Sequence, residues 1–231
     1  MAMLFKPLVY TQEQVKWLET RGLVYHVLMD FLSRPPRMSL IAQWRHKLGL
    51  NHRIEGSEGW RKLELYLESI EEDSFRHVCH QEAEEYIRLF TGHEAVVPAC
   101  ESTYRSRLEG VSAFACIAKV SKNYTDNGIV FNKLNGERDD HIALELEFMA
   151  VLAEGMLAKA NLQQSCLALA DSQISFLRLH LLRWARLFSR ELLQATNSPL
   201  YLAVAELMDD FLTADLNALC AWRNNQQEAE Q

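Results

Sequence analysis

The chain has 231 residues, of which 48% are apolar and 24% are charged, and its formal net charge is −7 with neutral histidines. This composition is typical of a folded globular protein and excludes disordered, collagen-like and disulfide-scaffold chains. An acidic balance also argues against a general nucleic-acid binder, which would carry a basic stripe. The chain contains only 9 Gly and 5 Pro, and this scarcity of turn formers favours long helices.

Cysteine usage and the apolar stretches indicate the compartment. The five cysteines are scattered without a CxxC pair, which fits a reducing cytosol. Residues 1–10 lack the apolar region and the small-residue cleavage site of an export signal. The most apolar long stretch, 142–158, carries Glu145, Glu147 and Glu154 and is too charged to span a bilayer. We therefore expect a cytoplasmic protein with no stable membrane insertion.

Helical periodicity dominates the first half of the chain, and no convincing strand pattern is present. Thr11 and Gln14 form a capping box, so a helix is expected to begin there and to stop before Pro35 and Pro36. The other expected elements are a short helix around Trp44 up to Gly49, a polar loop over 51–59, and helices over 63–70, 74–90 and about 103–123.

The second half is predicted to consist of a linker and three long helices. The expected elements are a Gly- and Asn-containing linker over 128–138, a helix opened by Asp139 and Asp140, a helix over 172–196, a helix from Ser198 and Pro199 to Trp222, and a frayed polar tail over 223–231. The helix after Asp140 is apolar on almost every side, which indicates a central buried helix. Pro at the first position after a Ser cap is a common helix start.

These elements predict an all-α protein of about eight to ten helices in one compact domain. The linker over 128–138 would act as a hinge between an N-terminal half, 1–127, and a C-terminal half, 139–222. Such a hinge permits domain exchange, so a monomer and a domain-swapped dimer are both compatible with the sequence.

Common catalytic motifs are missing from the sequence. It contains no P-loop, GxGxxG, GxSxG, HExxH or paired CxxC, so the usual nucleotide-dependent and zinc-hydrolase sites lose support. His77 and His80, with Glu84 on the same helical face as His80, do not reach the three or four ligands that zinc sites need. We expect no metal and no cofactor.

The most distinctive cluster is Glu137-Arg138-Asp139-Asp140-His141. One interpretation is a helix start, in which acidic side chains satisfy free N–H groups and contribute about 0.5–2 kcal/mol. The other interpretation is a docking surface. Asp140, Glu147 and Glu154 recur every seven residues and would share one helical face, and an acidic row beside apolar surface would suit a basic, partly apolar peptide.

Two further segments carry candidate functional side chains. The segment 98–105 combines a helix start with Tyr104, whose ring and hydroxyl could line a pocket. His180 and Trp184 are i, i+4 neighbours, which favours a satisfied core histidine packed on an indole. A basic stripe on the same helix consists of Arg183, Arg186 and Arg190. We expect this stripe to be a solvated face that pairs with nearby acidic residues.

Taken in order, these segments resemble the TorD/DmsD family of cytoplasmic chaperones for molybdenum-containing reductases. The resemblance covers about 14–216 and rests mainly on Pro-x-x-Glu-Ser-x-Tyr within 98–104 and on the hinge motif within 137–141. The family usually has Glu-Pro-Asp-x-His at the hinge. Here Arg138 stands where the Pro would be, which removes a fixed φ and adds a positive charge.

The resemblance implies a non-catalytic, TorD-like protein. Such a chaperone binds the twin-arginine signal peptide and the apo-catalytic subunit of a molybdoenzyme, of the dimethyl sulfoxide or trimethylamine N-oxide reductase type, during cofactor insertion and before export. The peptide-binding residues expected from the two motifs and the acidic row are Asp139, Asp140, His141, Glu101, Tyr104 and Glu147.

Two rival functions remain open at the level of sequence. A metal-dependent hydrolase would use Asp139, Asp140 and His141 together with His77 and His80. A purely structural all-α adaptor would have no affinity for a twin-arginine peptide.

Overall fold

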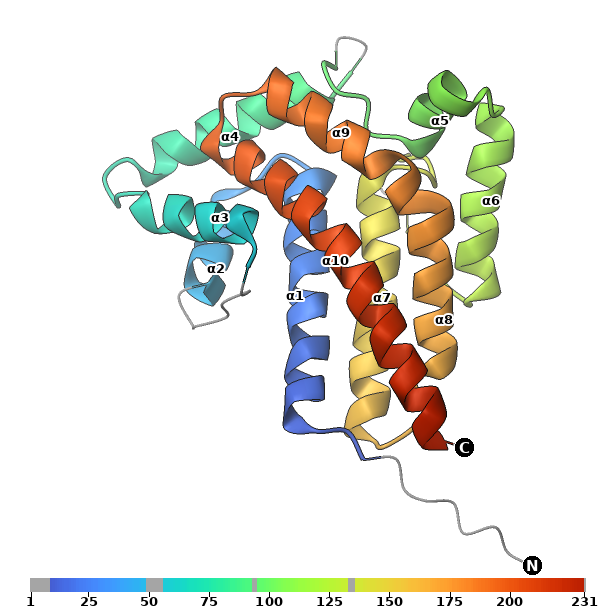
Figure 1. Ribbon diagram of the computed structural model, residues 1–231. Helices are drawn as coiled ribbons and strands as arrows, with labels where there is room; N and C mark the ends of the chain where they lie inside the picture. The colour runs from blue at the N-terminus through green and yellow to red at the C-terminus, as the bar shows by residue number, and fades with distance from the viewer. Residues whose placement is uncertain (1–8, 49–55, 93–94, 133–135, 231) are drawn as a thin grey trace, which may run out of the picture.

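A computed structural model of the chain describes residues 9–48, 56–92, 95–132 and 136–230. This part of the chain is all-α, as predicted, and holds an isolated β-bridge but no strand (Figure 1). The helices are α1 (Gln12–Ser33), α2 (Met38–Leu48), α3 (Glu58–Ser69), α4 (Phe75–Phe90), α5 (Glu101–Glu109), α6 (Ala113–Asp126), α7 (Ile142–Asn161), α8 (Leu167–Phe176), the π-helical turn η1 (Leu177–Leu181), α9 (Leu182–Ala195) and α10 (Pro199–Glu230). Because α8, η1 and α9 follow one another directly, they form one bent helical run.

The central helix is α7, as its apolar sequence predicted. It lies beside α1 and α8, and its buried side chains include Leu146, Phe148 and Met149, all with no exposed surface. The helices α2, α3 and α4 lie on one side of this centre, and α5 and α6 lie on the other (Figure 1). Within the described residues, no helix combines the length and the apolarity that a membrane crossing needs.

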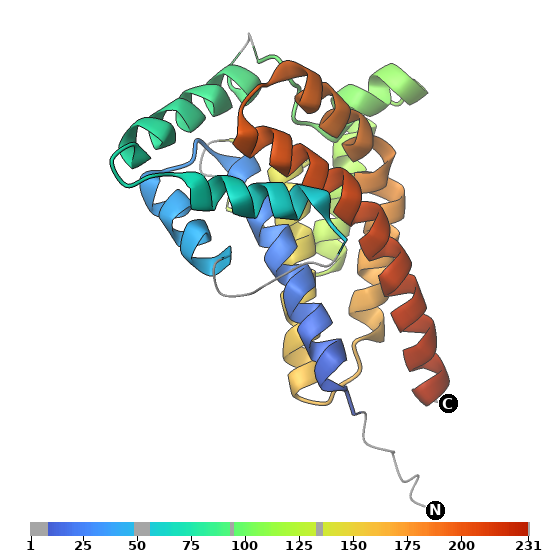
Figure 2. The same cartoon turned by 60° about the vertical axis from the view of Figure 1, so that its left-hand side comes forward.

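The start of α3 corrects the predicted loop over 51–59, of which 51–55 lie outside the described residues. Ser57 caps the helix by accepting a hydrogen bond from the Trp60 N–H at 3.2 Å, so α3 already begins at Glu58. Gly59 therefore lies inside the helix. A Cβ at this position would be 2.1 Å from the Leu207 backbone nitrogen on α10. The lack of a side chain therefore permits the close packing of α3 on α10 (Figure 2).

The single helix predicted over about 103–123 is two helices in the structure. Gly110 ends α5 in the left-handed conformation, with φ of 67°, and its N–H bonds to the Ser106 carbonyl at 3.2 Å. A left-handed glycine is a common helix end. The chain therefore turns between α5 and α6, which form a hairpin at the edge of the molecule.

The remaining boundary differences also have physical causes. The last helix was predicted to stop at Trp222 and to leave a frayed tail, but α10 continues to Glu230. Arg223 pairs with Asp171 on α8 at 2.8 Å, and Gln226 is buried, so tertiary contacts hold these added turns. The capping box of Thr11 and Gln14 at the start of α1 is confirmed.

A buried ion pair fastens α1 to α10. The Arg21 Nε donates to Asp215 Oδ1 at 2.5 Å, and both side chains are almost fully buried. Tyr25 donates to the same carboxylate at 2.7 Å, and Arg21 also donates to Gln173 of α8 at 2.9 Å. Because every partner of Asp215 lies on another helix, this network fixes how α1, α8 and α10 pack.

Candidate functional site

The motif within 98–104 and the hinge motif within 137–141 are far apart in the sequence but lie side by side in the structure. The Glu101 N–H donates to the Asp140 carbonyl, and the Ile142 N–H donates to the Ala99 carbonyl, both at 2.9 Å. These bonds form a short antiparallel bridge between the residues that precede α5 and those that precede α7. The start of α5 and the end of the hinge segment are therefore one structural unit.

Asp140 caps α5, not the helix that follows it. Its Oδ2 accepts a hydrogen bond from the Ser102 N–H at 2.8 Å, and its side chain is fully buried. The Arg138 guanidinium holds the same carboxylate from the other side, at 3.0 and 2.9 Å, and donates to the Ser102 hydroxyl. Arg138, the departure from the family pattern, thus supplies the positive charge that the buried Asp140 requires.

His141 is the residue that caps α7. Its Nδ1 accepts a hydrogen bond from the Ala143 N–H at 3.2 Å, which requires that this nitrogen be unprotonated. Burial lowers the pKa of His141 below its ordinary value, although Glu137 and Asp140 offset part of the effect. The predicted helix opening by Asp139 and Asp140 is therefore shifted to Ile142, with a neutral histidine as the cap.

Asp139 is half-buried and faces α6. Its Oδ2 accepts a hydrogen bond from the Ser121 hydroxyl at 2.5 Å, and its carbonyl accepts one from the Tyr124 hydroxyl at 2.8 Å. Asp139 therefore joins the hinge segment to the C-terminal part of α6.

The expected acidic row does not form one continuous surface. Asp140 precedes α7 and is buried, whereas Glu147 is half-buried and lies close enough to His26 of α1 for the histidine to lower its pKa. Burial has the larger effect and raises the pKa of Glu147 above its ordinary value. Glu154 is exposed and contacts His26 Nε2 at 2.6 Å. The row therefore divides into a buried cap and two carboxylates along the edge between α1 and α7.

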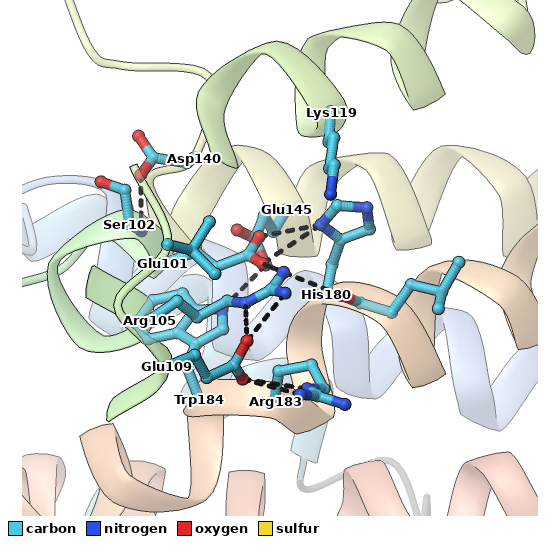
Figure 3. A network of polar contacts seen from close by, with 12 residues as sticks. Glu101, Ser102, Arg105, Glu109, Lys119, Asp140, Glu145, His180, Arg183 and Trp184 are labelled. Atoms are coloured by element: carbon cyan, nitrogen blue, oxygen red, sulfur yellow. Dashed lines mark hydrogen bonds and ion pairs between the residues drawn. The ribbon is translucent and has the colours of Figure 1, made fainter. Parts of the chain in front are cut away.

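Glu101 belongs to a buried polar network (Figure 3). Its carboxylate contacts His180 Nδ1 at 2.9 Å and accepts a hydrogen bond from Arg105 at 2.6 Å, with no exposed surface. Burial alone would raise its pKa, but the hydrogen bonds that His180 and Arg105 donate to it outweigh burial and lower it. Arg105 also binds Glu109, which in turn binds Arg183 on α9 at 2.8 Å.

His180 is a satisfied core histidine, as expected, but its ring stacks on Phe176 at 4.9 Å between ring centres. Its Nε2 contacts the Asn123 Nδ2 at 3.1 Å, and the same Nδ2 donates to the Lys119 carbonyl at 2.9 Å. The Lys119 carbonyl thereby fixes the orientation of the Asn123 amide, so Nε2 must accept. These contacts assign a neutral His180 that carries its proton on Nδ1 and donates it to Glu101.

Tyr104 lies in the core and not at a pocket wall. Its ring centre is 5.2 Å from that of Trp184, and its hydroxyl donates to Glu191 at 2.9 Å. The residue has no exposed surface, and burial raises the pKa of its hydroxyl. The motif tyrosine therefore anchors α5 on α9.

The basic stripe on α9 is largely paired, as the sequence suggested. Arg183 binds Glu109, and Arg186 contacts Asp209 at 3.4 Å.

The rival metal site gains no geometric support. His80 contacts Glu84 at 3.3 Å on the exposed face of α4, and the described ranges hold no group of three or more His, Cys, Asp or Glu side chains placed to share a metal ion.

Sequence reasoning missed three members of the network, Arg105, Glu145 and Asn123. A signal for Glu145 was present, because a carboxylate within a helix that is apolar on every side must be buried and requires a partner. Arg105 could have been found as the i, i+4 partner of Glu101. Nothing in the sequence connects Asn123 to a histidine 57 residues later.

Comparison with known families gives one match that covers most of this site. The family model described as nitrate reductase delta subunit matches residues 55–190. The matched segment is more than half of the chain and contains both motifs and the buried network. A comparison with curated proteins gives no significant match.

Proposed function

Because the chain belongs to the nitrate reductase delta subunit family, whose members are maturation chaperones of molybdoenzymes, we propose that it binds a twin-arginine signal peptide. The client is the apo-catalytic subunit of a molybdoenzyme, held in the cytoplasm during cofactor insertion and before export. The family match is the observation that carries this proposal. Members of the family act as chaperones and not as enzymes.

Burial divides the proposed peptide-binding residues into two groups. Glu101, Tyr104 and Asp140 are fully buried and bonded within the protein. Their role in the proposal is to hold α5 in place, because Asp140 binds it to the hinge segment, Glu101 to His180 and Tyr104 to α9. Asp139 and His141 are half-buried at the end of the hinge, where a bound peptide can touch them directly.

Glu147 would take part from the edge between α1 and α7. Its half-buried carboxylate lies next to apolar side chains of α7, such as the 39% exposed Val151. A guanidinium group suits such a carboxylate, because its fixed fork of donors matches the two oxygens. The apolar part of a signal peptide would then pack on α7 beside Val151.

The charge distribution supports attraction of a basic peptide to this protein. The segment 58–85, which includes α3 and most of α4, holds nine Asp or Glu and three Lys or Arg. Six of these carboxylates, Glu58, Glu68, Glu71, Glu72, Asp73 and Glu84, are exposed. An acidic surface of this kind raises the rate at which a basic peptide arrives, and added salt weakens the effect.

The proposal is tested by the maturation of a client. A twin-arginine molybdoenzyme reductase is expressed with and without this protein, and the molybdenum content of the purified reductase is measured. We expect a higher molybdenum content when the protein is present, and a smaller increase with the surface variant Glu147→Gln. Equal molybdenum contents with and without the protein, for reductases of the nitrate, dimethyl sulfoxide and trimethylamine N-oxide types alike, would contradict the proposal.

A further inference from the structure

Two carboxyl groups lie together in the buried network, with few positive charges to balance them. Glu101 of α5 and Glu145 of α7 both have no exposed surface, and their side chains are close enough to share a hydrogen bond (Figure 3). Trp184 Nε1 donates to one oxygen of Glu145 at 3.2 Å. Among the described residues, the other oxygen, Oε1, has no donor. A proton on Oε1 would turn it into a donor to Glu101 and satisfy both groups.

The positive charges around Glu101 and Glu145 can compensate only one negative charge on the pair. Arg105 binds Glu101, but its charge is shared with Glu109. His180 adds no positive charge, because its hydrogen bonds assign the imidazole the neutral form. The titratable or charged groups that face the pair are Arg105 on α5, Cys116 and Tyr124 on α6, Cys100 and Asp140 before the two helices, and His180 on η1. A second buried carboxylate would add a charge that none of these groups compensates.

We propose that Glu101 and Glu145 share one proton, and that this pair is a pH-sensitive latch that holds the α5–α6 hairpin on α7 and α9. The latch joins the two sides of the hinge segment, because α5 and α6 precede it and α7 and α9 follow it. Loss of the proton would place two like charges side by side and push α5 away from α7. This inference concerns the protein itself and does not depend on the proposed client.

The direction of the pH effect follows from the protonation of Glu145. Burial, and then the charge of Glu101, raises the pKa of Glu145 well above its ordinary value of 4.5. The folded protein therefore keeps a proton that the unfolded chain releases above about pH 4.5. The stability that the latch contributes is complete below that pH and declines as the pH rises toward the raised pKa.

Hydrogen exchange followed by mass spectrometry tests the latch. The opening constant of peptides from α5 and α6 is measured between pH 6 and 9, after correction for intrinsic exchange, in the wild-type protein and in Glu145→Gln. Glutamine keeps the shape, accepts from Trp184 and donates to Glu101, but it cannot lose a proton. We expect the wild-type opening constant to rise by up to tenfold per pH unit, the limit for one proton, and the variant to show no such rise.

Two results would overturn the latch. One is a wild-type opening constant of α5 and α6 that does not change with pH. The other is an unchanged pH dependence in Glu145→Gln, which would assign the effect to another group such as His180. Should the variant fail to fold, infrared spectroscopy of the wild-type protein decides. A carbonyl band of a buried protonated carboxyl group at pH 7 supports the shared proton, and its absence excludes it.

Discussion

Replacing Asp140 by alanine tests whether the hinge motif is a helix cap for α5. The substitution removes the acceptor of the Ser102 N–H, and loss of a cap costs about 1 kcal/mol. Because that N–H is buried and would stay unsatisfied, the cost is expected in the upper part of the ~1–3 kcal/mol range of an unsatisfied buried donor. Arg138 adds little, since its side chain is 45% exposed and water can replace its partner. The expected loss in the free energy of unfolding is therefore about 2–3 kcal/mol.

Urea denaturation followed by circular dichroism measures this loss, with Asp140→Asn and Asp139→Ala as matched controls. Asparagine keeps an oxygen for the Ser102 N–H, so its cost should stay near 1 kcal/mol. Asp139→Ala removes the half-buried acceptor of the Ser121 hydroxyl and should also cost about 1 kcal/mol. If Asp140→Ala destabilises no more than these two controls, the cap across the two motifs is refuted.

Two further substitutions test the packing of α10. Gly59→Ala would place a Cβ 2.1 Å from the Leu207 nitrogen, so α3 must shift, and thermal unfolding should show a loss of about 3 kcal/mol or more; an unchanged melting temperature would show that the close approach is not tight. Asp215→Ala leaves Arg21 buried without its carboxylate and should cost about 3–5 kcal/mol in urea denaturation. A loss below 1 kcal/mol would show that solvent reaches Arg21 readily.

The sequence predicted the helices well, because their signals are local. The capping box of Thr11 and Gln14, the Ser198 cap and the apolar surface of α7 each depend on residues within a few positions of one another. The break at Gly110 is also a local signal, whereas two other boundaries that differ depend on distant contacts. Gly59 is predicted as a loop residue because its contact with α10 cannot be seen in the sequence. The ion pair between Arg223 and Asp171 likewise joins residues that no local pattern connects.

The sequence selected several residues of the candidate site but did not predict their burial or their partners. The motif residues Glu101 and Asp140 were selected from a resemblance, and the structure brings their segments together. Their burial could not be read from the sequence, because a helix-start acid is normally exposed. The partners that make burial possible, Arg138 and His180, lie 2 and 79 positions away from the groups they serve.

The central claim, binding of a twin-arginine signal peptide, is tested most directly by titration calorimetry at low salt. The probe is a reductase leader peptide, and the control is the same peptide with its two arginines replaced by glutamine. We predict that the arginine peptide binds and that its affinity falls as salt rises. At the same salt, its affinity for Glu147→Gln should be lower than for the wild-type protein. The control peptide should bind the wild-type protein with a much lower affinity. Equal affinity for both peptides, or no heat of binding from leaders of several reductases, would contradict the account.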